Sequence, residues 1–138
     1  MPQFFVGTTD VNADVGCIQS WDGIFSEGAF RGDLIELDWV DGAEWLPGPK
    51  KAYSFDVPII IDGGSLDLSF SLFATVKGWH TSSTLTLTRT YTVGATSVSE
   101  ECSAVMVSEL SPVIIGGRAI KVVAIFQNLD GEWTAVTP

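Results

Sequence analysis

The residues that could carry out chemistry are few in this sequence, and they form no recognisable catalytic pattern. His80 is the only histidine, so a metal site made of several histidines is excluded, and a Ser-His-Asp triad would have to use this residue. Ser82 and Ser83 follow it, but no G-x-S-x-G turn presents either hydroxyl as a nucleophile. We therefore expect His80 to be a surface residue and the protein not to be an enzyme.

The acidic residues suggest two further kinds of site. Asp10-x-Asn12-x-Asp14 matches the opening of an EF-hand calcium loop, but Val15 stands where the loop needs Gly and Trp21 where it needs a bidentate Glu. A solvated turn is therefore expected. With seventeen acidic residues, some pair will always suit glycoside hydrolysis, so that signal is nonspecific. Because the usual glycine-rich nucleotide motifs are absent as well, we expect no metal ion and no cofactor.

The net charge of −10 is concentrated in the first half of the chain. Residues 1–67 contain twelve acidic and three basic side chains, whereas residues 68–138 contain five and four. Such an acidic surface repels the phosphate backbone, so binding of nucleic acid through basic contacts is not expected. The same surface is compatible with a wall past which DNA slides without adhering.

The N-terminal segment has the composition of an extended arm and not of a secretory signal peptide. It lacks a basic stretch followed by a long apolar one, and no apolar run in the chain approaches the roughly 20 residues that span a membrane. Residues 1–16 are rich in Gly, Thr and Asp, so we expect an extended arm preceding a single domain at residues 17–138. Without a secretory signal, Cys17 and Cys102 are expected to be free, buried thiols.

Alternation of apolar and polar residues predicts most of the strands. The clearest case is residues 53–62, where every second side chain from Tyr53 to Ile61 is apolar and would face a core. Pro58 falls on the other face and suits an edge strand or a bulge, because it has no N–H. Further strands are predicted at residues 32–40, 83–93, 97–110 and 118–129.

Several side chains differ in polarity from the surroundings that the pattern predicts for them. Arg89 lies on the apolar face of its strand, where a bare guanidinium would be costly, so we expect it near an end or against a carboxylate. Val123 and Ile125 leave the outer face of the last strand partly apolar. Residues 41–51 are rich in Gly and Pro and predict a projecting loop, whose Trp45-Leu46 pair either forms a contact surface or folds back.

Residues 65–78 have two interpretations. Their leucines alternate as in a strand. Phe70, Phe73 and Val76, in contrast, have the spacing of one face of a helix, and Ser65 could be the N-cap of that helix. The residues alone leave both open. With either one the chain is mainly β, an antiparallel β-sandwich or flattened barrel with at most one helix.

A set of short motifs along the chain resembles the β-sandwich domain of tailed-phage tail proteins, the group that includes the tail tube and distal tail proteins of siphophages. The last of them looks like the terminal strand and turn of distal tail-like proteins from phages of actinobacteria. The motifs are FRGD at 30–33, GPK at 48–50, YSFDVPIIIDGG at 53–64, LTLTR at 85–89 and FQNLDGEW at 126–133.

The resemblance implies a structural protein of the virion. It makes residues 65–77 a single helix flanking the sandwich, and it offers no catalytic residues to transfer. Subunits of this family join into a homo-oligomeric ring, here expected to be a hexamer, around a lumen that DNA crosses without specific binding. Neighbouring tail proteins are the other partners, assembly occurs in the host cytoplasm, and no membrane is involved. The host-binding domain of many distal tail proteins has no counterpart here, so a minimal ring or adaptor is expected.

The contact residues expected for such a ring are Trp45, Leu46, Val123 and Ile125, because exposed apolar patches and sheet edges otherwise invite aggregation. Two other classes remain open. Five Trp on a β-sandwich could stack on sugars, as in carbohydrate-binding modules, although their spread along the chain assigns most of them to the core. An extracellular adhesion module is the other class.

Overall fold

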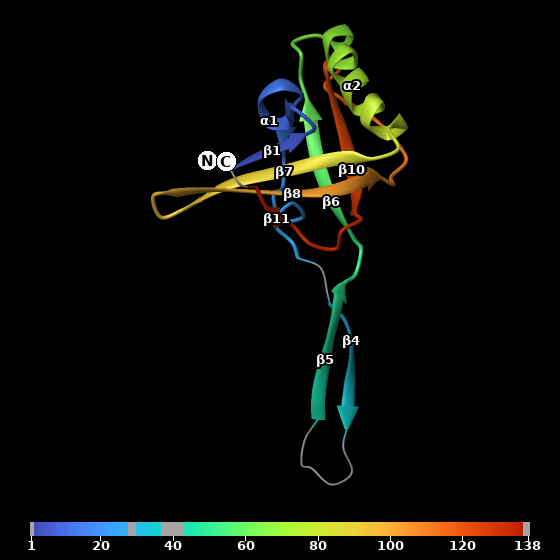
Figure 1. Ribbon diagram of the computed structural model, residues 1–138. Helices are drawn as coiled ribbons and strands as arrows, with labels where there is room; N and C mark the ends of the chain where they lie inside the picture. The colour runs from blue at the N-terminus through green and yellow to red at the C-terminus, as the bar shows by residue number, and fades with distance from the viewer. Residues whose placement is uncertain (1, 28–29, 37–42, 137–138) are drawn as a thin grey trace.

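The computed structural model describes residues 2–27, 30–36 and 43–136. In these residues one antiparallel sheet curls into a half-barrel, one long helix covers it, and a two-stranded hairpin stands apart (Figure 1). The order in the main sheet is β2-β1-β7-β8-β10-β6-β3, with β9 added to β10 and β11 to β8. The expected mainly β fold with a flanking helix is therefore confirmed, in its curled, barrel-like form.

The bounds of the elements are as follows. The main sheet contains β1 (Gln3–Val6), β2 (Thr9–Asp10), β3 (Cys17–Ile18), β6 (Tyr53–Ile61), β7 (Leu85–Val93), β8 (Thr96–Met106), β9 (Val113–Ile115), β10 (Ala119–Asn128) and β11 (Thr134–Ala135). The hairpin contains β4 (Phe30–Glu36) and β5 (Ala43–Lys50), and the helices are α1 (Val11–Asp14) and α2 (Leu66–Thr81).

The strands β6 and β10 form the centre of the core. They pair in register from Ile61↔Ile120 to Tyr53↔Asn128, and the alternate side chains between these ends are buried on one face. The predicted inward faces of both strands are confirmed. The Pro58 carbonyl accepts a hydrogen bond from the Gln19 N–H at 2.9 Å, so it points toward the β3 side of the strand. The N–H that proline lacks would point the same way, so its absence costs no hydrogen bond with β10, and Pro58 is tolerated.

The ambiguous segment is a helix, and it runs further than expected. The Ser65 hydroxyl caps α2 by accepting from the Leu68 N–H at 3.3 Å. The buried stripe of α2 ends at Trp79, whose ring lies 6.3 Å from that of Phe126. This contact holds the last turn against the sheet, so the helix passes through Gly78 instead of ending there.

The expectation of an N-terminal arm is wrong, because this segment belongs to the core. Phe4 and Val11 are fully buried, and β1 pairs with β7. The chain then runs from the β2 edge of the sheet through α1 to the β3 edge, where the Asn12 side chain accepts from the Ile18 N–H at 3.0 Å. The Asp10 side chain caps α1 by accepting from the Ala13 N–H at 3.4 Å. The polar residues that suggested an arm thus serve as turns and caps while the apolar ones fill the open side of the half-barrel.

The two cysteines are free but differ in their surroundings. Cys102 is buried, and burial raises the pKa of its thiol to about 12. Cys17 is exposed, so the expectation that it is buried is wrong. It lies in β3, a two-residue edge strand whose other residue, Ile18, faces the core. Successive side chains of a strand point to opposite faces, and this leaves the thiol of Cys17 outside.

The predicted loop at residues 41–51 is largely a strand. β5 pairs with β4 in a register that sets Trp45 opposite Leu34 and Leu46 opposite Asp33. The prolines that suggested a loop are compatible with β5 because this strand has a partner on one side only. The side chains of Trp45 and Leu46 lie outside the described part of the structure, as do residues 37–42, so their expected role stays a prediction.

Candidate assembly interface

The surface that best fits a binding role is the face of β6 and β10 turned away from the core. The register sets Ile60 beside Lys121 and Val113 in one row, Pro58 beside Val123 in the next, and Asp56 beside Ile125 in a third. Val107 extends the third row, because its N–H donates to the Ile125 carbonyl at 2.8 Å. We call the apolar part of this surface the outer apolar face: Pro58, Ile60, Val107, Val113, Val123 and Ile125.

The outer apolar face consists of apolar side chains that are nevertheless exposed to solvent. Val113 is 58% exposed, Val107 50% and Val123 38%, while the neighbours of Val123 along β10, Val122 and Ala124, are buried. Scattered apolar residues are common on protein surfaces, but a contiguous group on a regular sheet face is typical of a contact site. The structure therefore places both described residues of the predicted interface, Val123 and Ile125, on one apolar surface.

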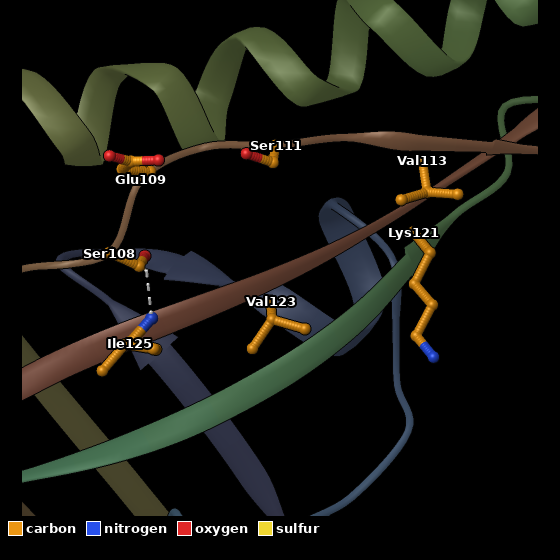
Figure 2. Close-up of a pocket in the computed structure, with 7 residues that line it drawn as sticks. All are labelled: Ser108, Glu109, Ser111, Val113, Lys121, Val123 and Ile125. Atoms are coloured by element: carbon orange, nitrogen blue, oxygen red, sulfur yellow. Dashed lines mark hydrogen bonds between the residues drawn. The ribbon is translucent and has the colours of Figure 1, made fainter.

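An open groove of about 570 Å³ runs beside Val123 and Ile125 (Figure 2). It exists because the chain leaves β10 after Val107 and returns to it only at Val113. At the point of departure the Ser108 hydroxyl accepts from the Ile125 N–H at 3.1 Å, which fixes the wall of the groove. Its lining residues are Ser108, Glu109, Ser111, Val113, Lys121, Val123 and Ile125.

Val123 and Ile125 also line a shallower hollow of about 280 Å³ together with Ser54, Phe55 and Asp56. The two side chains therefore form a ridge between two depressions. A ridge with hollows on both sides can interlock with a partner surface instead of only lying flat against it. The sequence could not reveal this shape, because the strand that ends at Met106 was expected to continue through residue 110, which would have filled the groove.

Arg89 is the one buried cation among the described side chains, and its partners confirm the expectation of a carboxylate. Its guanidinium contacts Glu27 at 2.6 Å and Glu100 at 3.0 Å, and it donates to the Ile24 carbonyl at 2.9 Å. The same group lies over the Trp133 ring, 4.4 Å from its centre. These contacts satisfy the charge of Arg89 and attach the segment before β4 to the main sheet.

Other contacts at the base of the hairpin also attach the segment before β4 to the main sheet. The Tyr53 hydroxyl donates to the Ser26 carbonyl at 2.8 Å and accepts from the Trp133 indole N–H at 2.8 Å. Burial raises the pKa of Tyr53 above its usual value, at which the hydroxyl is already protonated and able to donate at neutral pH. Gly23 lies so close to the backbone of Asp56 that a Cβ atom would overlap with it. Both ends of the hairpin are thus adjacent to elements that pack on the core. Residues 23–27 precede β4 and contact the main sheet, and β6 follows β5.

Replacing Arg89 by Met should destabilise the subunit by about 3 kcal/mol, because the two carboxylates lose their cation and the hairpin base loses an anchor. Urea denaturation followed by circular dichroism measures the change. The matched control is Arg118→Met, since Arg118 pairs with Asp62 at 2.8 Å on the surface and should matter little. Equal effects of the two substitutions would contradict the role given to Arg89.

The remaining predicted site residues do not come together. His80 is exposed in the last turn of α2. Trp79 and Trp133 are buried, and Trp21 packs on Phe25 with ring centres 6.2 Å apart, so these three indoles form no exposed platform for a sugar. The side chains of the other two Trp lie outside the described residues. No cluster of three or more metal-binding side chains occurs in the described part of the chain.

Comparison of the chain with known protein families, with curated proteins and with solved structures found no match. None of the helices in the described ranges is long and apolar enough to cross a membrane. The features of the described structure that bear on function are therefore the outer apolar face and the groove beside it.

Proposed function

We propose that this chain is a structural subunit that assembles with copies of itself through the outer apolar face. More specifically, we propose a tail component of a phage virion, a tail tube, distal tail or adaptor subunit whose ring surrounds a DNA-conducting lumen. The observation that carries the proposal is the group of exposed apolar side chains at Val107, Val113 and Val123, which lie in adjacent rows on one face of a regular sheet. A partner surface would remove this apolar area from water.

The edges of the sheet support assembly through a face. Its outermost strands, β2 and β3, are only two residues long, and short edge strands prevent open-ended pairing between sheets. A contact through one defined face allows a closed symmetric assembly instead. The combination of a curled antiparallel sheet and one flanking helix is also the fold that the resemblance to tail proteins implies.

The charge of the chain fits a ring that conducts DNA. Asp14, Asp22, Asp62 and Asp67 are exposed, all within the acidic first half. If these side chains line the bore, they repel the phosphate backbone and DNA passes without adhering. Acidic side chains directed outward from the assembled ring would contradict this part of the proposal.

Val123→Asp tests the contact directly. We expect the wild-type chain to form oligomers and the variant to remain monomeric at the same concentration, with at least a hundredfold weaker association, because the new carboxylate would be desolvated at the interface. Sedimentation velocity gives the masses, and circular dichroism checks that the fold is kept.

The matched control for this test is Val93→Asp. Val93 is 60% exposed but lies at the turn between β7 and β8, away from the outer apolar face. This variant should assemble like the wild type. If Val123→Asp assembles as well as Val93→Asp, the outer apolar face is not the contact surface.

A further inference from the structure

We propose that two copies of the chain stack their outer apolar faces on each other around a two-fold axis, with Lys121 of each copy paired with Asp56 of the other. This inference deepens the proposed function and rests on it, because it identifies what covers the exposed face. The occupant is the same face of a second copy.

Two opposite charges border the apolar centre of this face. Lys121 and Asp56 are both exposed, and no ion pair joins either of them to another described residue. Glu109 lines the groove together with Lys121 and forms no ion pair with it. Charges beside a contact surface favour a partner that brings the opposite charge to each of them. The partner of this face should therefore carry a carboxylate for Lys121 and a cation for Asp56.

The register places these two charges symmetrically. Asp56 precedes Pro58 by two residues in β6, and Lys121 precedes Val123 by two residues in β10. Because the strands are antiparallel and Pro58 pairs with Val123, the two charges lie on opposite sides of this central row. A two-fold axis that crosses the strands at this row brings the lysine of each copy over the aspartate of the other. The face is thus complementary in charge to itself.

The same axis covers the apolar side chains. It sets the row of Ile60 and Val113 in one copy against the row of Ile125 and Val107 in the other, with Val123 of both copies at the centre. Two sheet faces pack in this way about 10 Å apart, with strand directions within about 30° of each other. A lysine and an aspartate side chain that extend toward each other can meet across this separation.

A contact of this kind limits what the face can build. It uses the same surface of both copies and therefore joins two subunits and no more. The pair is then the unit from which a ring forms, so a variant that loses the contact stays monomeric, as expected for Val123→Asp. A ring of such pairs contains an even number of copies, with each pair joined to the next through another surface.

Exchanging the two charges in the full chain tests the pairing. Lys121→Glu and Asp56→Lys, each alone, should associate at least about tenfold more weakly than the wild type, because like charges then meet on both sides of the axis. The double variant, with both substitutions in one chain, should associate like the wild type, since every pair is restored with reversed sign. A 1:1 mixture of the two single variants should recover as well, in pairs that contain one copy of each. Sedimentation velocity over a range of concentrations measures the association.

The matched control is Lys77→Glu. Lys77 is exposed on α2, which packs on the core face of the sheet, and its substitution changes the net charge as much as Lys121→Glu does. This variant should associate like the wild type. Circular dichroism and thermal melting verify that all four variants fold as the wild type does.

The outcomes separate the two proposals. A wild-type chain that stays monomeric would overturn the proposed function. If the wild type assembles, the two-fold contact is overturned when Lys121→Glu associates as well as Lys77→Glu, or when the double variant stays as weak as the single ones. Either of these results leaves assembly through the face intact.

Discussion

Ile59→Asp should abolish folding, whereas Ile60→Asp in the next position should leave the subunit folded. Ile59 is fully buried in β6, and a carboxylate there would lie within the hydrophobic core. Burying such a group costs several kcal/mol, which is comparable to the total stability of a typical domain of about 5–15 kcal/mol. We expect an insoluble product or a chain without a cooperative melting transition.

The Ile60 variant is a matched control because it differs by one position along the same strand. Ile60 lies on the opposite face, in register with Lys121, so a new carboxylate there reaches water and a cation. Far-ultraviolet circular dichroism and thermal melting of both variants measure the difference. A folded, soluble Ile59→Asp variant would overturn the strand assignment on which the core and the outer apolar face both depend.

Deleting residues 1–8 should also prevent folding. The deletion removes Phe4 and Val6 from the core and leaves β7 without its neighbour β1. The ring of Phe4 lies 6.0 Å from that of Phe126, and loss of a buried Phe side chain alone costs about 3–5 kcal/mol. The truncated chain should show no cooperative transition in urea.

The less drastic variant Phe4→Ala allows the same claim to be measured in a folded protein. It should lower the free energy of unfolding by about 3–5 kcal/mol, while Gln3→Ala, one residue earlier with its side chain exposed, should change it little. A truncated chain with an unchanged melting temperature would show that residues 1–8 are an appendage after all.

The sequence predicted the centre of the fold well because every second side chain of β6 and β10 is apolar. Each strand has one buried face, so a period of two is visible in the residue types. Arg89 could be assigned a carboxylate partner on energetic grounds. Of its two carboxylate partners, Glu100 lies directly opposite in the neighbouring strand. Glu27 could not be predicted, because it is 62 residues away in the chain and reaches Arg89 only after the segment before β4 folds over the sheet.

Two wrong predictions, the arm at residues 1–16 and the loop at residues 41–51, have a common cause, which is that turn-forming residues do not exclude regular structure. In the first sixteen residues Gly, Thr and Asp cap and connect very short elements while Phe4, Val6 and Val11 fill the core. In β5 the prolines are tolerated because one edge of the strand carries no partner. Such elements are defined by tertiary contacts and have too few residues for a periodic pattern.

The candidate interface was predicted only in part. Val123 and Ile125 were identifiable because they break the alternation of β10. Val107 and Val113 join the same surface only because the chain leaves the sheet between them. The groove therefore depends on a local departure from strand pairing, which residue types did not indicate.

The central claim is that this chain assembles with itself, and negative-stain electron microscopy with light scattering on the same purified sample tests it most directly. We predict closed rings or stacks of rings, with a mass that is a whole-number multiple of 14.8 kDa. A strict 14.8 kDa monomer at high concentration, with no particles on the grid larger than a single subunit, would contradict it.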